Sequence, residues 1–478
     1  MGNRKSKNLL ILIGVLVIIS AVTFGVSRYE KHVEEIKATD ETILSIDSSA
    51  VTALSWVNGD VTLAFHKDGE EWVYDEDSTF PVDPAKIENL LSIFNDFGAS
   101  YVIGNVTDYG DYGLEDPTCT ISITADGKDY TVLLGGFSKM DEQRYVSIGD
   151  GNAYLVQTDP YESFNIALSD MILNDVVPNV EKATKIDISG VDDYEILYEE
   201  NSGKSSNEED VYFAGDKPLD TYKVSTYLQT VSSIALTEYA QYDASEDSLE
   251  QYGLDEPELT LNISYPPEEE SAAESAASES TASEVFALSV SRNRDEVDRA
   301  LQSKEEDAEA SVAAYARVGE SPIIYKITSQ EYEELIAASY NDMRHTAVIN
   351  ATSDDITQID IVLEGESYEL TSKGSGEKKK WYLGEEELED ILTLQSAIDS
   401  LVAQDADNFC DRTPDSSMKE EIRMTVHLDN ENFPQIETVF YRYDGTNCLA
   451  TVDGEPFAYI TRDKVVDLIE AVHGIVLK

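Results

Sequence analysis

Thr52-Ala53-Leu54-Ser55-Trp56 starts a strand pattern that occurs three times in this chain. It returns as Thr184-Lys185-Ile186-Asp187-Ile188 and again as Thr357-Gln358-Ile359-Asp360-Ile361. After each occurrence the sequence predicts an aromatic strand, a helix and then paired strands. The aromatic residues are Trp72, Tyr212 and Trp381, and the last strands end near Tyr154, Tyr325 and Tyr459. Repeated units of this kind are typical of scaffolds and binding surfaces, so the repeat predicts an architecture and not a reaction.

The predicted helix of each copy carries one apolar stripe. In the first two copies, apolar residues recur at offsets of 3, 4, 7 and 10, and in the third Gln395 replaces the one at offset 4. The stripe residues are Ile87, Leu90, Leu91, Phe94 and Phe97; Val224, Tyr227, Leu228, Val231 and Ile234; Ile391, Leu394, Ile398 and Leu401. This spacing places them on one face of a helix, which must be buried. Asp83-Pro84 predicts the start of the first helix.

The N-terminal sequence predicts a membrane anchor. Residues 9–26 form a run of 18 apolar or small residues without a charge, near the lower end of what spans a bilayer. Arg4, Lys5 and Lys7 precede the run, which predicts residues 1–8 in the cytoplasm and everything after residue 26 outside. A cleaved signal peptide is the alternative, but the run is longer than usual for one and lacks a clear cleavage site. We therefore expect a single-pass protein of the cell membrane with an extracytoplasmic C-terminal region.

The region after the anchor is long enough for three domains, which we place at residues 43–170, 171–343 and 344–478. Alternating segments such as Thr120-Ile121-Ser122-Ile123 predict antiparallel sheets with one solvated face. The predicted fold class is α+β: a single N-terminal transmembrane helix, then three repeated modules, each a mainly antiparallel sheet with a packed helix. Residues 266–284 lack basic and large apolar side chains, so we expect a disordered acidic insert between two paired strands.

The chain is strongly acidic, with 34 basic and 95 acidic residues and a formal net charge of -61. Such a surface repels nucleic acid, so we expect no nucleic-acid partner. The charge favours solubility outside the cell, and loose capture of divalent cations or of a basic partner is the alternative. The acidic segments at residues 405–408 and 429–432 lack the glycine and the distal glutamate of a calcium loop. We interpret both as solvated turns.

No motif in the chain predicts catalysis. The five histidines form no His-x-x-x-His pair, and phosphate-binding loops and nucleophile elbows are missing from the sequence. Two Ser-x-x-Lys matches, which begin at Ser375 and Ser416, have no companion motifs. Carboxylate pairs for glycoside hydrolysis stay open, because 95 acidic residues supply many candidates. We predict a protein that is not an enzyme, without catalytic, cofactor-binding or metal-binding residues.

The chain has three cysteines, Cys119, Cys410 and Cys448, an odd number that rules out a fully paired set. Cys410 and Cys448 fall in the same predicted module, but their spacing does not decide whether they form a disulfide. We take buried free thiols as the default for all three.

Two copies share a short signature after the helix, Tyr112-Gly113-Leu114-Glu115-Asp116-Pro117 and Tyr252-Gly253-Leu254-Asp255-Glu256-Pro257. Glycine permits a positive φ and proline directs entry into the next strand, while the tyrosine and leucine are expected to close a small core. Together with the segments at residues 72–91, 112–123 and 145–156, the signature resembles the domain-of-unknown-function family 4340. The resemblance implies a membrane-anchored outer protein that is auxiliary to an ABC transporter of the gliding-motility type. It implies no catalytic residues.

The sequence and the resemblance favour a non-enzymatic, extracytoplasmic accessory protein at a bacterial cell surface. The expected partners are the membrane and an ABC transporter permease or another membrane protein, and no cofactor is expected. The alternative is a free-standing cell-surface module that binds wall glycan or peptide. A hydrolase with an acidic site is a third hypothesis.

Overall fold

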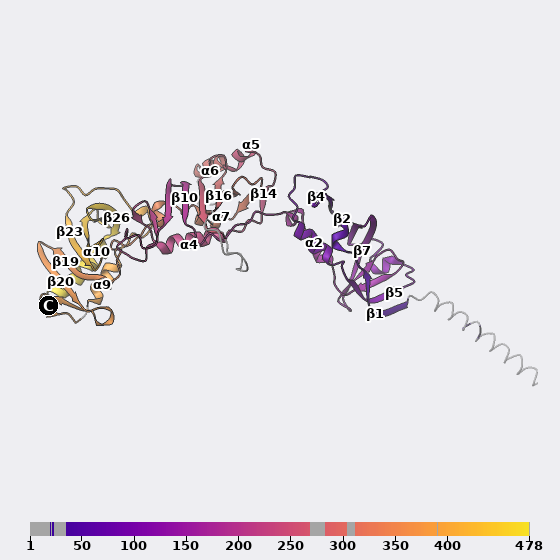
Figure 1. The fold of residues 1–478 in the computed structure, drawn as a ribbon, viewed down its shortest axis with the longest axis horizontal. Coiled ribbons are helices and arrows are strands. Elements are labelled where there is room, and N and C mark those ends of the chain that lie inside the picture. The colour runs from indigo at the N-terminus through magenta and orange to yellow at the C-terminus, as the bar shows by residue number, and fades with distance from the viewer. Residues whose placement is uncertain are drawn as a thin grey trace, which may run out of the picture. The chain divides into compact units, whose positions relative to one another are not determined.

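The computed structural model describes residues 35–267, 283–303, 311–389 and 391–477, together with Ser20 and Val22. The chain divides into two compact units, Met1–Asn174 and Asp175–Lys478. The first unit holds one sheet and the second unit holds two (Figure 1). Neighbouring strands of all three sheets are antiparallel wherever the structure describes their pairing.

The first sheet has the strand order β1-β5-β9-β8-β7-β6-β2-β3-β4. Its strands are β1 (Glu35–Leu44), β2 (Val51–Asn58), β3 (Val61–Asp68), β4 (Glu71–Tyr74), β5 (Phe97–Gly104), β6 (Cys119–Ala125), β7 (Lys128–Ser138), β8 (Gln143–Ser147) and β9 (Ala153–Val156). The helices of this unit are η1 (Ser48–Ala50), α2 (Pro84–Ser92), η2 (Tyr109–Tyr112), α3 (Tyr161–Phe164) and η3 (Leu168–Met171). Trp56 lies in the core, where its ring packs against Phe65 and Phe164.

The second sheet has the order β13-β12-β11-β10-β15-β16-β17-β18-β14. Its strands are β10 (Lys185–Gly190), β11 (Tyr194–Tyr198), β12 (Tyr212–Ala214), β13 (Lys217–Pro218), β14 (Tyr239–Gln241), β15 (Leu259–Tyr265), β16 (Glu284–Arg292), β17 (Ala314–Val318) and β18 (Ile324–Ile327). Its helices are α4 (Thr221–Ser232), α5 (Glu246–Leu249), η4 (Glu250–Tyr252), α6 (Arg294–Leu301), α7 (Ser329–Ile336) and α8 (Tyr340–Met343). Figure 1 shows α4 and α7 along one side of this sheet.

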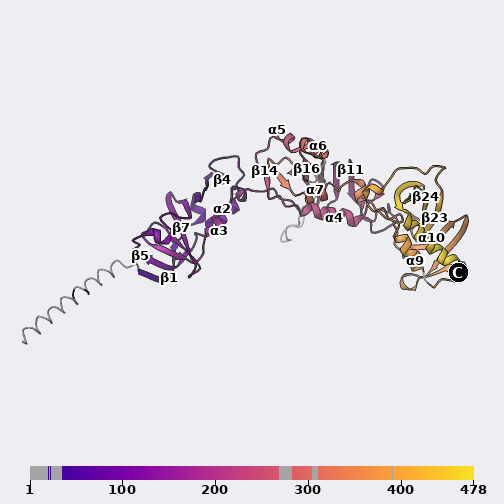
Figure 2. The same ribbon diagram turned by 180° about the vertical axis from the view of Figure 1, so that it is seen from behind.

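The third sheet has the order β22-β21-β20-β19-β23-β24-β25-β26. Its strands are β19 (Ile356–Leu363), β20 (Glu366–Lys373), β21 (Lys380–Leu383), β22 (Glu386–Glu387), β23 (Glu420–Leu428), β24 (Gln435–Arg442), β25 (Asn447–Val452) and β26 (Glu455–Thr461). Its helices are η5 (Gly376–Lys378), α9 (Leu392–Asp399), η6 (Ala406–Asn408) and α10 (Arg462–Val476). The paired helices α9 and α10 lie beside the strands of this sheet (Figure 2).

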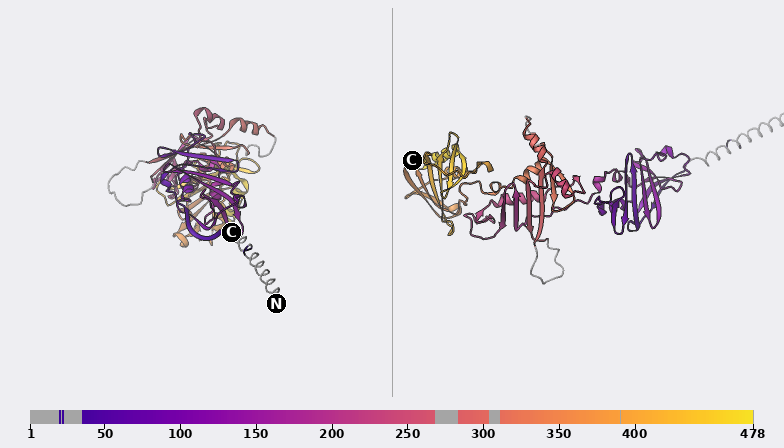
Figure 3. Two further views of the ribbon diagram at one scale, coloured as in Figure 1. Left: turned by 90° about the vertical axis from the view of Figure 1, so that its right-hand side faces the viewer. Right: turned by 90° about the horizontal axis from the view of Figure 1, so that it is seen from above.

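The three sheets, drawn from two further sides in Figure 3, share one order over seven strands: β9-β8-β7-β6-β2-β3-β4 in the first, β18-β17-β16-β15-β10-β11-β12 in the second and β26-β25-β24-β23-β19-β20-β21 in the third. In the first and second sheets, the strand after the main helix returns to pair with the last strand, β5 with β9 and β14 with β18. In the third sheet a single bridge between Phe409 and Ala458 takes the place of that strand pair. The connectors also correspond, because the carbonyls of Met171 and Met343 accept hydrogen bonds from the N-cap residues Asp83 and Asp220.

The apolar stripes are buried as expected, but the helices that carry them end before the last residue of each stripe. Asp83 is the N-cap of α2, accepting a hydrogen bond from the amide of Ala85, which confirms the predicted helix start. The residue at offset 10 lies beyond the helix in every copy: Phe97 begins β5, Ile234 follows α4 and Leu401 follows α9. Each stripe is therefore shared between a short helix and the chain that follows it.

The glycine signature closes a small core in both copies that carry it. Gly113 and Gly253 have φ values of 68° and 72°, and each follows a 3-10 turn. The tyrosine before each glycine packs on a tyrosine of a neighbouring strand, Tyr112 on Tyr145 at 5.0 Å and Tyr252 on Tyr315 at 4.8 Å between ring centroids. The leucine after each glycine is buried in the same cluster. The predicted packing role of the signature is confirmed.

The predicted fold class is wrong. The described chain is mostly β, with three antiparallel sheets and short helices, because the apolar stripes supply only two to four helical turns each and the sheets carry additional short strands. The predicted transmembrane helix at residues 9–26 lies outside the described residues, apart from Ser20 and Val22. Within the part of the chain that the structure describes, no helix is long and apolar enough to cross a membrane.

Most of the predicted acidic insert lies outside the described residues, which resume at residue 283. The strands on either side of it, β15 and β16, pair with Tyr265 opposite Glu284, as expected for a hairpin extension. All three cysteines are free thiols, but Cys410 is only half-buried, so the expectation of burial holds for Cys119 and Cys448 alone.

Candidate functional site

The second unit contains a pocket of about 710 Å³, a volume within the range of small-molecule sites. Five segments line it: residues 204–206, the turn at 216–218, Tyr340 of α8 with the connector that follows it, residues 411–413, and residues 452–457 at the β25–β26 hairpin. Two additional side chains, Phe433 and Ile436, add apolar surface. The pocket thus lies between the two sheets of this unit, which are the second and third sheets of the chain.

The connector that follows α8 is held from both sides. On the side of the second sheet, the carbonyl of Met343 accepts from the amide of Asp220 at 2.9 Å, and the carbonyl of Arg344 accepts from Lys223 Nζ at 3.0 Å. On the side of the third sheet, the amide of Ala403 donates to the carbonyl of Thr346 at 2.8 Å. Side chains on this segment are therefore presented to the pocket by a fixed backbone.

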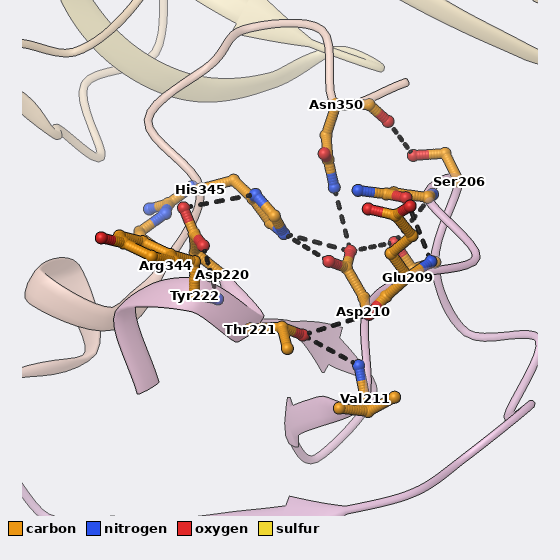
Figure 4. A network of polar contacts seen from close by, with 12 residues as sticks. Ser206, Glu209, Asp210, Val211, Asp220, Thr221, Tyr222, Arg344, His345 and Asn350 are labelled. Carbon is orange, nitrogen blue, oxygen red and sulfur yellow. Dashed lines mark hydrogen bonds and ion pairs between the residues drawn. The ribbon is translucent and has the colours of Figure 1, made fainter. Parts of the chain in front are cut away.

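A buried carboxylate, Asp210, ties the connector to the loop before β12 (Figure 4). Its side chain is 2% exposed and accepts from Ser205 at 2.5 Å and from Asn350 at 3.1 Å. Nε2 of His345 lies 3.0 Å from both carboxylate oxygens, and the other ring nitrogen lies 3.9 Å from Asp220. His345 and Asn350 are about 140 residues from Asp210 in the sequence, so these hydrogen bonds hold two distant segments of the chain together.

The guanidinium of Arg344 lies in an aromatic setting at the pocket. Its central carbon is 4.2 Å from the ring centroid of Phe409, 5.0 Å from Phe457 and 5.3 Å from Tyr340. A guanidinium that stacks on a ring through its face keeps the N–H donors at its edge for other partners. Burial lowers the pKa of Arg344, and the nearby Tyr340 and Asp411 side chains act against that effect.

Arg344 differs from Arg144 and Arg292 in having no carboxylate partner. Arg144 pairs with Asp159 at 2.8 Å and Arg292 pairs with Glu258 at 3.0 Å. Among the residues that the structure describes, no carboxylate oxygen lies within 4.0 Å of the Arg344 guanidinium. Half-buried Arg317 and Arg462 likewise make no ion pair with the described residues, so the aromatic setting at the pocket is what distinguishes Arg344.

The other charged groups at the pocket are engaged or exposed. Lys204 pairs with Glu199 at 3.0 Å and with Asp216 at 3.4 Å. Lys217 is exposed and lies 5.3 Å from the ring centroid of Tyr340. Asp411 is exposed at the rim. Arg344 is therefore the cationic group best placed to meet a ligand inside the pocket.

A second pocket, of about 640 Å³, lies between α9 and α10. Its acidic lining residues Asp467 and Glu470 are exposed, and the rest of its lining is mainly the apolar and small side chains of two packed helices. Half-buried Lys464 also lines this pocket, but the lining holds no aromatic side chain, so we regard it as a groove of the helix pair and the Arg344 pocket as the candidate site.

The sequence analysis named no site residues, and it missed this pocket. Its Ser-x-x-Lys matches lie elsewhere, with Ser375 and Ser416 both exposed. In the part of the chain covered by the structure, no three His, Cys, Asp or Glu side chains are grouped as metal ligands. One signal could have found the pocket: the position after the connector methionine is buried Ile172 in the first copy and Arg344 in the second.

The comparison with family profiles gave two matches, at residues 72–257 and 212–421, both to the domain of unknown function DUF4340. The matches begin at Trp72 and Tyr212, the aromatic strands of the first two copies. No curated protein and no solved structure matched the chain. Together the matches cover residues 72–421, well over half of the sequence, and the resemblance suggested by the glycine signature is confirmed: the chain belongs to the DUF4340 family.

Proposed function

We propose that this protein is a non-enzymatic binding component that works beside an ABC transporter and holds a ligand in the Arg344 pocket. The pocket is the observation that carries the proposal. It combines a volume of about 710 Å³ with aromatic side chains and a guanidinium that lacks a carboxylate partner. A concave site that offers apolar surface beside polar groups able to orient a ligand is the usual place for small-molecule binding.

Association with a transporter is the finer part of the proposal. It is supported by the modular sheet architecture and by membership of the DUF4340 family, for which the sequence analysis expected a transporter-auxiliary role. Placement outside the cytoplasm stays a prediction, because it rests on the first 26 residues, of which only Ser20 and Val22 are described.

The proposal is tested by affinity purification of the full-length chain from native membranes in mild detergent, with mass spectrometry of the co-purified proteins. We expect an ABC permease and its ATPase in near-stoichiometric yield. An unrelated acidic protein with the same tag is the control bait, because a charge of -61 can retain basic proteins without specificity. Recovery of the chain alone would contradict the transporter association, and recovery with wall fragments would favour the alternative of a free-standing surface module.

A further inference from the structure

The N–H edge of Arg344 is the most unusual polar group of the pocket. Three aromatic rings have their centroids within 5.3 Å of the central carbon of the guanidinium, and burial removes part of its water. A charged group that is partly removed from water is costly unless a counter-charge and hydrogen bonds replace the lost solvent. Arg144 and Arg292 meet that need with a carboxylate, and Arg344 does not.

Arg344 occupies the position that corresponds to an apolar residue, Ile172, in the first copy. Ile172 follows Met171 and is 2% exposed, whereas Arg344 follows Met343 in the same connector geometry. Packing alone would be met by an isoleucine at this position, as it is in the first unit. A guanidinium adds five N–H donors in a planar fork that matches the two oxygens of a carboxylate.

We propose that the pocket binds a ligand through a carboxylate that pairs with the Arg344 guanidinium, with the apolar body of the ligand against Phe457 and Phe433. The inference rests on the proposed function in taking this pocket as the ligand site. A single carboxylate suits the site better than a multiply charged anion, because the rim carries the exposed carboxylates of Asp411 and Glu455. The carboxylate can come from a peptide C-terminus or from a non-peptide acid.

The test is isothermal titration calorimetry with the purified full-length chain in mild detergent. The probes are N-acetyl-leucyl-phenylalanine, the same dipeptide with an amidated C-terminus, and 4-phenylbutyrate. The acid and amide peptides share one body and differ in the carboxylate. We expect saturable binding of the peptide acid and affinity for the amide about ten-fold or more weaker, as for the loss of a charge-assisted hydrogen bond. Phenylbutyrate binding as tightly as the peptide acid would assign the site to non-peptide acids.

The variant Arg344→Gln is expected to abolish the difference between the acid and the amide. Its matched control is Arg299→Gln, which makes the same change of charge at a side chain that is 73% exposed, and which should bind the acid as the parent chain does. Asp411→Asn provides a test that does not depend on how Arg344 variants fold. Removing this exposed competing carboxylate should raise the affinity for the acid by about two- to five-fold, the range of an exposed charge pair.

Three results would overturn the inference: equal binding of the acid and amide peptides, no saturable binding of either acid, or equal losses in Arg344→Gln and Arg299→Gln. These outcomes are separate from those of the membrane purification. Recovery of a permease without carboxylate binding would reject the ligand class and leave the accessory function standing. Carboxylate binding without recovery of a permease would support the ligand class and reject the accessory function beside a transporter.

Discussion

Asp210 shows how a single buried carboxylate can join two parts of one unit. Its oxygens accept hydrogen bonds from Ser205 and Asn350 and lie 3.0 Å from the ring of His345. Each partner replaces water that the carboxylate loses on burial. Because His345 directly follows Arg344 in the connector, the network also sets the position of the proposed ligand-binding side chain.

The first residue-scale prediction concerns His345→Ala. The variant leaves Asp210 buried with one partner fewer, and we expect a loss of about 1–3 kcal/mol in the free energy of unfolding. The control is His427→Ala in the same unit, where the pair with Asp360 is 2.8 Å long but more exposed, and we expect a loss of about 0–1 kcal/mol. Urea unfolding followed by circular dichroism measures both. Equal losses would show that the Asp210 network does not depend on burial.

The cysteines make a second prediction at this scale. Burial raises the pKa of the Cys119 and Cys448 thiols to about 11, from an ordinary value of 9.0. Because these pKa values are higher in the folded chain, the neutral thiols contribute stability below pH 9 that is lost as the pH rises towards 11. At pH 8 we expect iodoacetamide to modify half-buried Cys410 alone in the native chain, as read by mass spectrometry. Modification of Cys448 at a similar rate without urea would contradict this.

At the scale of elements, the glycine signature is a backbone requirement. In the second copy, a Cβ on Gly253 would lie 2.2 Å from the carbonyl oxygen of Arg292, and the φ of 72° disfavours any side chain. We expect Gly253→Ala to lower the free energy of unfolding by about 2–4 kcal/mol, from left-handed strain plus the clash. The control Gly319→Ala has a φ of 49° and open space, so strain alone should cost about 1–2 kcal/mol.

Urea unfolding of the two glycine variants separates the two causes. A loss in Gly253→Ala no larger than in Gly319→Ala would mean that β16 moves freely away from the turn. That result would remove the explanation for a glycine in both copies of the signature, since Gly113 meets the backbone of Gly136 in the same way, at 2.8 Å.

The elements that were predictable from sequence are those specified by local chemistry. The helix start at Asp83 and the positive φ of Gly253 follow from nearest neighbours along the chain, and the structure has both. The balance of strand over helix was not predictable in this way, because an apolar residue such as Phe97 fits a helix stripe and a strand equally well. The hydrogen-bond network at Asp210 joins residues about 140 positions apart, and local sequence patterns carry no information on such a pairing.

For the whole molecule, the formal net charge of -61 means that some basic side chains meet more than one carboxylate, as Arg423 does with Glu420 and Glu437. Arg344 lies beside aromatic rings instead, with no carboxylate oxygen of the described residues within 4.0 Å of its guanidinium. The excess of acidic residues also means that folding brings like charges together over the entire surface.

The last prediction is that salt stabilises the folded chain. Raising NaCl from about 0.01 M to about 0.5 M shortens the Debye length several-fold and screens the repulsion between exposed carboxylates. Each exposed like-charge pair costs a few tenths of a kcal/mol, so we expect the free energy of unfolding to rise by about 1–3 kcal/mol, measured by urea titration. The matched control is CaCl₂ at the same ionic strength. An equal rise in both salts fits screening and the solubility interpretation of the charge. A clearly larger rise in CaCl₂ would favour capture of divalent cations, and an unchanged urea midpoint would show that the acidic residues are spaced widely enough to avoid repulsion.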